Sequence, residues 1–193
     1  MINLNKEIKI LYVHGYNGHP DGNSAQLLRK VLKEKNIKAI VDAPAIPFLE
    51  PEKVAKFIEE QEDYDLIVAS SLGAFFSMIK GEACKILVNV AKPEDLLKIE
   101  PNISKEYIDS LYKARGMVLG HQEKTAFIFG SRDTIAQNKS YIEKNYYFRL
   151  SKTIDMDHHL DEVGINAVCD TIIELSLCGY DKTREKEEWI YED

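Results

Sequence analysis

The segment DLIVASSLGA, residues 65–74, passes from an apolar, β-branched run directly into small residues. Such a run predicts a short buried strand, and the residues from Leu72 onward predict a helix that follows at once. Ser71 stands at the junction, with Ala69 two positions before it and Gly73 two positions after it. Small residues at these places let the helix pack closely on the strand and lift the serine hydroxyl above the sheet. The segment therefore predicts a nucleophile elbow, in which Ala69 replaces the usual first glycine.

Strands and helices alternate on both sides of this junction. Apolar runs predict strands at residues 8–14, 38–43, 65–70, 86–90, 125–129 and 147–154. Helical spacing predicts one helix capped by Asn23 or Ser24, a second that begins at Pro51, a third over 72–80 and a last one over 163–175. Two shorter helical pieces are predicted at 94–98 and 105–113. This alternation predicts an α/β fold of three layers, with a mainly parallel central sheet and helices on both faces. We expect residues 1–193 to form a single domain, with 93–120 as a small helical cap inserted over the site.

Composition excludes several classes of protein. The chain has 193 residues, 45% of them hydrophobic and 30% charged, and a formal net charge of −7. A negative net charge disfavours a general nucleic-acid binder, because phosphate binding needs concentrated Lys and Arg. No apolar run approaches the roughly 18 residues of a membrane span, and the N-terminal segment has no signal-peptide pattern. We therefore expect a cytoplasmic protein with no nucleic-acid or membrane partner; no feature indicates an oligomeric state.

The cysteines indicate neither a disulfide framework nor a metal site. Cys84, Cys169 and Cys178 have no metal-binding spacing, and an odd number argues against a set of disulfides. This usage is typical of a reducing compartment.

In parallel sheets, ligands collect at the carboxyl ends of the strands. The predicted ends carry polar groups at His14-Gly15, Ser70-Ser71, Asn89, after Gly130 and after Ile154. We expect the functional site along this edge.

A serine hydroxyl needs a base to remove its proton and a third group to orient that base. In folds with a nucleophile elbow, these partners follow in the order Ser, then Asp or Glu, then His. Asp133 follows a predicted strand, and His158 lies between the last strand and the closing helix. We predict Ser71, Asp133 and His158 as the catalytic residues. For Asp133 the alternative is a helix N-cap, and for Ser70 or Ser71 it is likewise a cap.

The neighbouring His159 is an alternative base. We prefer His158 because His159-Leu160 is expected to begin the closing helix. Asp155 and Asp157 are alternative orienting groups, although their closeness in sequence to the histidines makes a suitable reach harder.

Acyl chemistry also needs backbone N–H donors for the oxyanion of the tetrahedral intermediate. We predict the N–H groups of Leu72 and Tyr16 as these donors. Gly15 permits the close approach of the loop after the first strand, and His14 is interpreted as a hydrogen-bonded residue that shapes this loop.

These motifs resemble a known group, the YqiA-like (YqiA/YcfP-type) family of small bacterial α/β-hydrolases. The resemblance is carried by LYVHGYNG at 11–18, SSLG at 70–73, VNVAKP at 88–93, Gly130-x-x-Asp133 and the Asp157-His158 region. It implies an α/β-hydrolase fold and a serine esterase acting on short acyl esters or thioesters through Ser71, Asp133 and His158. It implies no cofactor and no metal. Ala69 and Met156-Asp157 depart from the family pattern, where glycines are common.

Two other classes of function compete with this hypothesis. A metal hydrolase could gather His14, His19, His158, His159 and nearby Asp residues, but none has a metal-type spacing. A non-catalytic protein that binds a ligand or another protein could keep the hydrolase scaffold, since fold does not dictate function. Against it, the elbow, acid, base and oxyanion loop occur together and in the correct order.

Overall fold

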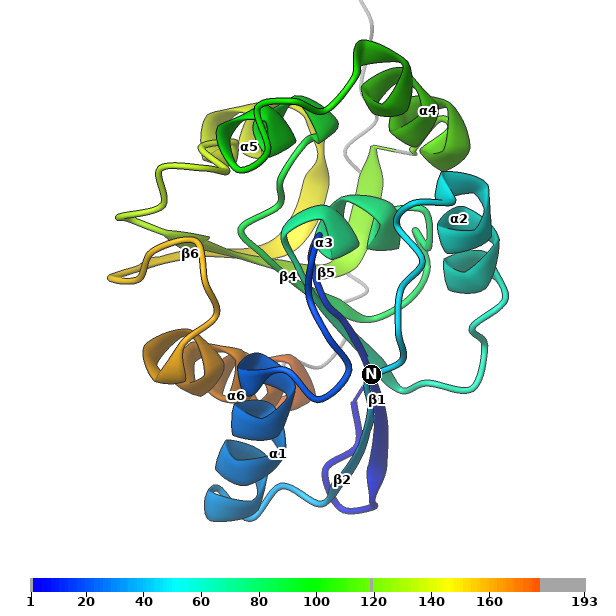
Figure 1. The fold of residues 1–193 in the computed structure, drawn as a ribbon. Helices are drawn as coiled ribbons and strands as arrows, with labels where there is room; N and C mark the ends of the chain where they lie inside the picture. Colours follow the sequence, from blue (N-terminus) through cyan, green and yellow to red (C-terminus); the bar gives the residue numbers. More distant parts are fainter. Residues whose placement is uncertain (1, 119, 178–193) are drawn as a thin grey trace, which may run out of the picture.

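The computed structural model describes residues 2–118 and 120–177 (Figure 1). Cys178 and the acidic segment at 185–188 therefore lie outside the described residues. Within them, six strands form one parallel sheet in the order β2-β1-β3-β4-β5-β6. The strands are β1 (Ile8–Val13), β2 (Ala39–Asp42), β3 (Leu66–Ser70), β4 (Lys85–Val88), β5 (His121–Gly130) and β6 (Tyr147–Ile154). Every predicted strand is present, and only β5 differs by more than two residues, because it begins four residues before Thr125.

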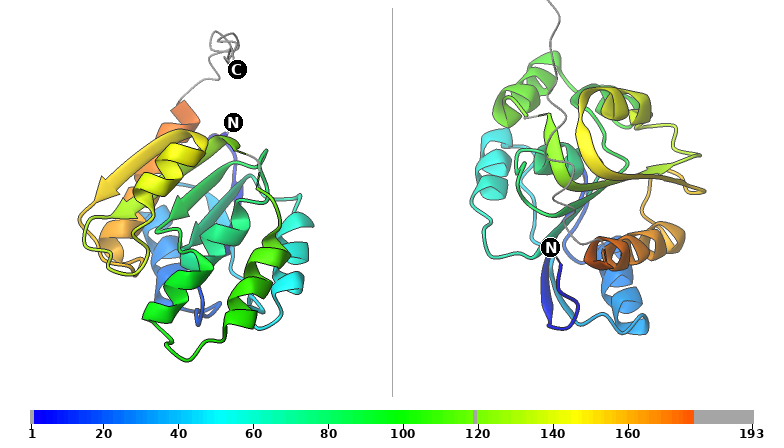
Figure 2. Two further views of the ribbon diagram at one scale, coloured as in Figure 1. Left: turned by 90° about the horizontal axis from the view of Figure 1, so that it is seen from above. Right: turned by 180° about the vertical axis from the view of Figure 1, so that it is seen from behind.

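Helices cover both faces of the sheet, as predicted. The helices are α1 (Asn23–Glu34), α2 (Pro51–Glu59), α3 (Ser71–Ser77), the 3-10 helix η1 (Pro93–Lys98), α4 (Lys105–Arg115), α5 (Lys139–Asn145) and α6 (Glu162–Leu177). Helices α1 and α6 lie side by side on one face, and α2 to α5 lie on the other (Figures 1 and 2). Residues 93–120 contribute η1 and α4, and α4 packs beside α2. No helix within the described ranges is long and apolar enough to cross a bilayer.

The alternation of side chains along the strands divides the core into two apolar layers. In β1, Ile10 and Tyr12 face the layer under α1 and α6, whereas Leu11 and Val13 face the layer under α2 and α3. All four are buried. Both faces of the sheet must therefore be covered, which explains why a central strand such as β3 is a continuous apolar run.

One local prediction was wrong, and one helix was missed. Helix α1 is preceded by Gly22 as its N-cap and uses no side-chain cap. Ser24 instead donates its hydroxyl to the carbonyl of Leu160, at 2.8 Å, and so ties α1 to the segment before α6. Helix α5 was not predicted, because Ile142 is its one buried residue and seven residues give little periodic signal.

The order of the strands reverses at β1 and β3. After β1 the chain passes to α1 on one face, and after β3 it passes to α3 on the other (Figure 1). The loops that leave these neighbouring strands thus diverge at their carboxyl ends and open a crevice there. Ser71 and the loop that follows His14 lie at this switch point.

A buried lysine lies at the opposite end of the sheet. Lys85 begins β4, is fully buried, and its Nζ donates to the carbonyl groups of Lys80 and Gly81 after α3. Burial lowers the pKa of Lys85 to about 7. This group stabilises the turn between α3 and β4.

Candidate active site

Ser71 lies in a strained turn between β3 and α3. Its φ is 54°, a left-handed conformation that non-glycine residues seldom adopt and that is common at functional sites. Space around the turn is tight, since a Cβ at Gly73 would stand 2.3 Å from the carbonyl oxygen of His14. The neighbouring Ser70 makes no side-chain cap to α3. Gly73, one of the two small residues predicted around Ser71, is thus required by the contact with the loop after β1.

His158 connects Ser71 to Asp133. Its Nε2 lies 2.9 Å from the Oγ of Ser71, and its Nδ1 lies 2.9 Å from Oδ2 of Asp133. A carboxylate can only accept, so the partners assign the proton of the neutral ring to Nδ1 and leave Nε2 to accept from the serine hydroxyl. The side chains of His158 and Asp133 are 8% and 2% exposed. The structure therefore brings the three predicted residues into one hydrogen-bonded chain.

Asp133 performs two tasks with its two carboxylate oxygens. While Oδ2 accepts from His158, Oδ1 accepts from the backbone N–H groups of Ile135 and Ala136, at 2.7 and 2.9 Å. Burial alone would raise the pKa of Asp133, but these hydrogen bonds outweigh it and the pKa is lowered. The predicted alternative, a helix N-cap, is wrong, because residues 134–136 contain a bend and no helix. The Asp133 carboxylate holds this bend through the same two N–H groups.

The choice between the two histidines follows from the loop after β6. His159 is exposed, and its N–H donates to the carboxylate of Asp157. The helix start expected at His159, on which the preference for His158 rested, was wrong, because α6 begins at Glu162. Asp155 pairs with the exposed Arg132, at 2.7 Å. Asp155 and Asp157, the alternative orienting groups, thus make other contacts, whereas Asp133 contacts His158.

Asn89 fixes the loops that carry the base and the acid. It follows β4 with a φ of 46° and is 1% exposed. Its Nδ2 donates to the carbonyls of Asp157 and His158, at 2.8 and 3.2 Å, and its Oδ1 accepts from the N–H of Gly130, at 2.7 Å. The sequence alone identifies Asn89 only as a polar residue at the end of a predicted strand. Its bridging of two loops far apart in sequence is a property of the folded chain.

The loop after β1 lies directly on Ser71. A Cβ at Gly15 would stand 2.7 Å from the Cβ of Ser71. His14 shapes this loop, as interpreted from the sequence: its Nδ1 contacts the carbonyl of Gly15 at 2.8 Å, and its Nε2 accepts from the N–H of Ile46 at 3.2 Å. Burial lowers the pKa of His14, which favours the neutral ring that this pattern requires.

Two backbone N–H groups remain available beside the serine hydroxyl. The N–H of Tyr16 has no hydrogen-bond partner among residues 2–118 and 120–177. The N–H of Leu72 lies in the first turn of α3, where no preceding turn can accept it.

A pocket of about 370 Å³ adjoins this loop. It is lined on one side by His14 and Tyr16 and on the other by the segment 46–50, with Phe48 packed against Tyr16. Tyr107 of α4 reaches the same place and donates its hydroxyl to the carbonyl of Phe48, at 2.6 Å. The volume is in the lower range of small-molecule sites.

The described residues contain no group of three or more His, Cys, Asp or Glu side chains that could hold a metal ion. His14, His158 and Asp155, which this alternative would gather, instead make the separate contacts described above. This part of the chain therefore offers no support for the metal-hydrolase alternative.

Solved structures with the same architecture define the class of fold. Est1E from Butyrivibrio proteoclasticus superposes with a TM-score of 0.64 at 16% identity, over 90% of each chain. The mouse alpha/beta hydrolase domain-containing protein 10 gives a TM-score of 0.61 at 15% identity, over 86% of this chain and 88% of that one. A thioesterase domain from the curacin biosynthetic pathway gives 0.57 at 14% identity, over 86% and 90%. The chain has an α/β-hydrolase fold that resembles those of esterases.

The sequence assigns the chain to a family within this class. A family model described as an uncharacterised protein family, UPF0227, matches residues 9–166. The chain belongs to this family, the YqiA/YcfP-like group that the motifs indicated. A search of curated protein sequences with this chain found no match.

Proposed function

We propose that the protein is a serine hydrolase that cleaves small acyl esters or thioesters through an acyl-enzyme. The observation that carries this proposal is the chain of two 2.9 Å contacts from Ser71 through His158 to Asp133. A buried carboxylate, an oriented imidazole and a strained serine in this arrangement are what nucleophilic acyl transfer requires.

The reaction begins when Oγ of Ser71 attacks the acyl carbonyl and Nε2 of His158 takes the hydroxyl proton. The C–O or C–S bond to the leaving group then breaks, and His158 returns the proton to that group. A water molecule, deprotonated by the same nitrogen, attacks the acyl-serine ester, and collapse of the second intermediate releases the acid and restores the hydroxyl. Asp133 keeps the proton of the neutral ring on Nδ1 and stabilises the imidazolium that forms in each step.

The oxyanion of each intermediate is bound by the N–H groups of Tyr16 and Leu72. Tyr16 lies in the loop after β1 and Leu72 in the first turn of α3, and these two segments meet where Gly15 approaches Ser71. Donors that are fixed before the reaction stabilise the developing charge without reorganising.

The pocket beside Tyr16 accommodates a short acyl or alcohol group. Its aromatic wall, Tyr16 and Phe48, is apolar, and its volume of about 370 Å³ favours small substrates over long chains. Residues 93–120 act as a helical cap over this pocket within a single domain, since Tyr107 of α4 is anchored at its rim. Solved structures of similar fold include an esterase domain from a Rhodothermus marinus protein and the curacin thioesterase domain, which supports both alcohol and thiol leaving groups.

The test is hydrolysis of p-nitrophenyl esters from acetate to laurate, together with acyl thioesters, by the wild type, Ser71→Ala and Ser70→Ala. Ser70 is the matched control, because it is also a buried serine of the same turn, with one weak contact to Tyr12 at 3.4 Å. We expect Ser71→Ala to lose about 10³-fold or more in kcat and Ser70→Ala to stay near the wild type. Folded wild type without activity above that of Ser71→Ala would favour the binding scaffold instead.

A further inference from the structure

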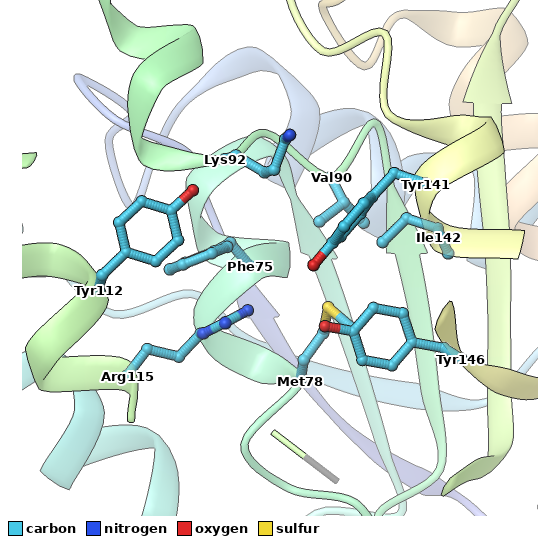
Figure 3. A pocket seen from close by; sticks show the side chains of 9 residues that line it. All are labelled: Phe75, Met78, Val90, Lys92, Tyr112, Arg115, Tyr141, Ile142 and Tyr146. Atoms are coloured by element: carbon cyan, nitrogen blue, oxygen red, sulfur yellow. The ribbon is translucent and has the colours of Figure 1, made fainter. Parts of the chain in front are cut away.

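A second pocket, which we call the tyrosine pocket, lies between α3, α4 and α5 (Figure 3). Its volume is about 30 Å³, and none of the three proposed catalytic residues lines it. The polar side chains of its wall are Lys92, Tyr112, Arg115, Tyr141 and Tyr146. Two cations and three phenols thus surround a space large enough for one small chemical group.

Arg115 is the unusual member of this wall. Its Nε is buried. Among the buried side-chain nitrogen and oxygen atoms of the described residues, it alone has no hydrogen-bond partner. The guanidinium lies 4.0 Å from the ring centre of Phe75 and 5.9 Å from that of Tyr112. No carboxylate pairs with Arg115 among residues 2–118 and 120–177. Stacking on aromatic rings holds the plane of this half-buried group but leaves its buried Nε–H without an acceptor, which is costly.

The second cation of the pocket is already neutralised. Lys92 pairs with Glu94 at 3.4 Å and lies 4.8 Å from the ring centre of Tyr141. The hydroxyl of Tyr112 donates to the other oxygen of the Glu94 carboxylate. Arg115 therefore carries the uncompensated positive charge of the site, although the whole chain has a net charge of −7.

The remaining phenols add donors on the opposite side of the space. Figure 3 shows the hydroxyl groups of Tyr141 and Tyr146 and the guanidinium of Arg115 pointing toward the centre of the pocket. Burial raises the pKa of Tyr146, which keeps its phenol protonated and able to donate. A phenol oxygen can donate or accept, but neither tyrosine supplies the negative charge that would compensate Arg115, so the space suits an anion.

We propose that the tyrosine pocket binds a small oxyanion, a carboxylate or phosphate group, with Arg115 as its main ligand. The planar fork of Nε–H and Nη–H groups matches two oxygens of either anion. Tyr141 and Tyr146 donate to the same group, and the volume restricts the bound part to the anionic end of a ligand. A bound anion would connect α4 to α3 and α5 and so stabilise the segment 93–120.

The experiment measures thermal unfolding of the full chain at low ionic strength, titrated with sodium acetate, sodium phosphate, or sodium chloride of equal ionic strength. The variants are Arg115→Gln, Tyr146→Phe and Lys113→Gln. Lys113 is the matched control, because it removes one exposed positive charge from the same helix. Tyr146→Phe removes one donor without removing the charge, and so keeps the test valid if Arg115→Gln folds poorly.

We expect a saturable rise in Tm with acetate or phosphate, beyond that with chloride, in the wild type and in Lys113→Gln. The apparent affinity falls about tenfold or more in Arg115→Gln and by a smaller factor in Tyr146→Phe. A response to acetate alone identifies a carboxylate ligand, and a response to phosphate alone identifies a phosphate ligand. Equal responses to all three salts, or responses that Arg115→Gln leaves unchanged, would overturn the proposal and leave a pocket that holds only water.

Discussion

Replacement of Asn89 by alanine separates the positioning of the proposed base from the stability of the fold. The change removes three hydrogen bonds, two to the carbonyls of Asp157 and His158 and one from the N–H of Gly130. At about 0.5–1.5 kcal/mol each, their loss lowers the free energy of unfolding by about 1.5–4.5 kcal/mol. Alanine at a φ of 46° adds about 1 kcal/mol, since asparagine tolerates the left-handed region better.

The same change releases the loop that carries His158. We expect kcat for ester hydrolysis to fall about 10²-fold, because a misplacement of about 1 Å at a catalytic group costs this much. KM should change little, since the pocket beside Tyr16 is lined by 14–18 and 46–50 and not by the loops that Asn89 holds. Urea unfolding gives the stability, and initial rates over a range of ester concentrations give kcat and KM.

Asn138→Ala is the matched control. Asn138 is also buried, and its Nδ2 donates to the carbonyl of Val90 and to Asp95 rather than to the loops of the base and the acid. We expect it to lose about 1–3 kcal/mol of stability and to keep its kcat. An Asn89→Ala protein that is destabilised as predicted but retains the kcat of the wild type would refute the positioning role.

Three further predictions follow from the same contacts. His158→Ala should abolish hydrolysis and His159→Ala should retain it, as measured by initial rates on acetate esters; the reverse pattern would move the base by one residue. Gly15→Ala should inactivate the protein, because the new Cβ would stand 2.7 Å from that of the nucleophile, whereas Gly120→Ala, with no atom closer than 3.7 Å, should have wild-type kcat. Lys85 has a pKa of about 7 in the folded chain and about 10.4 when unfolded, so the unfolded chain binds more protons between these values. The unfolding free energy of the wild type should therefore rise relative to that of Lys85→Met from about pH 7 to about pH 10, and a constant difference in urea unfolding would contradict this.

The fold could be predicted from the sequence because its central strands β3 and β4 are buried on both faces. The run that ends at Ser70 has no polar interruption, and all five residues of β3 are buried. Helix α5 could not be predicted in this way, since its contact with the core rests on Ile142. The predicted cap of α1 was wrong for a different reason. The hydroxyl of Ser24 donates to the carbonyl of Leu160, a tertiary partner that no local pattern reveals.

The candidate site was predictable to the extent that chain order and strand ends place residues at one edge. Ser71, Asp133 and His158 come together there, although the expected helix start that selected His158 over its neighbour was wrong. The bridging by Asn89 depends on three loops meeting, and the unpaired Nε of Arg115 depends on the packing of α4. Neither property is encoded in a motif, because both arise only from the folded arrangement.

Labelling with a fluorophosphonate probe tests the central claim most directly, because such probes modify only an activated serine. Intact mass would be compared for the wild type, Ser71→Ala and the matched Ser70→Ala. We predict that the wild type and Ser70→Ala each gain the mass of one probe and that Ser71→Ala gains none. Folded wild type that remains unmodified, or Ser71→Ala that is modified as fully as the wild type, would contradict the assignment of Ser71 as the nucleophile.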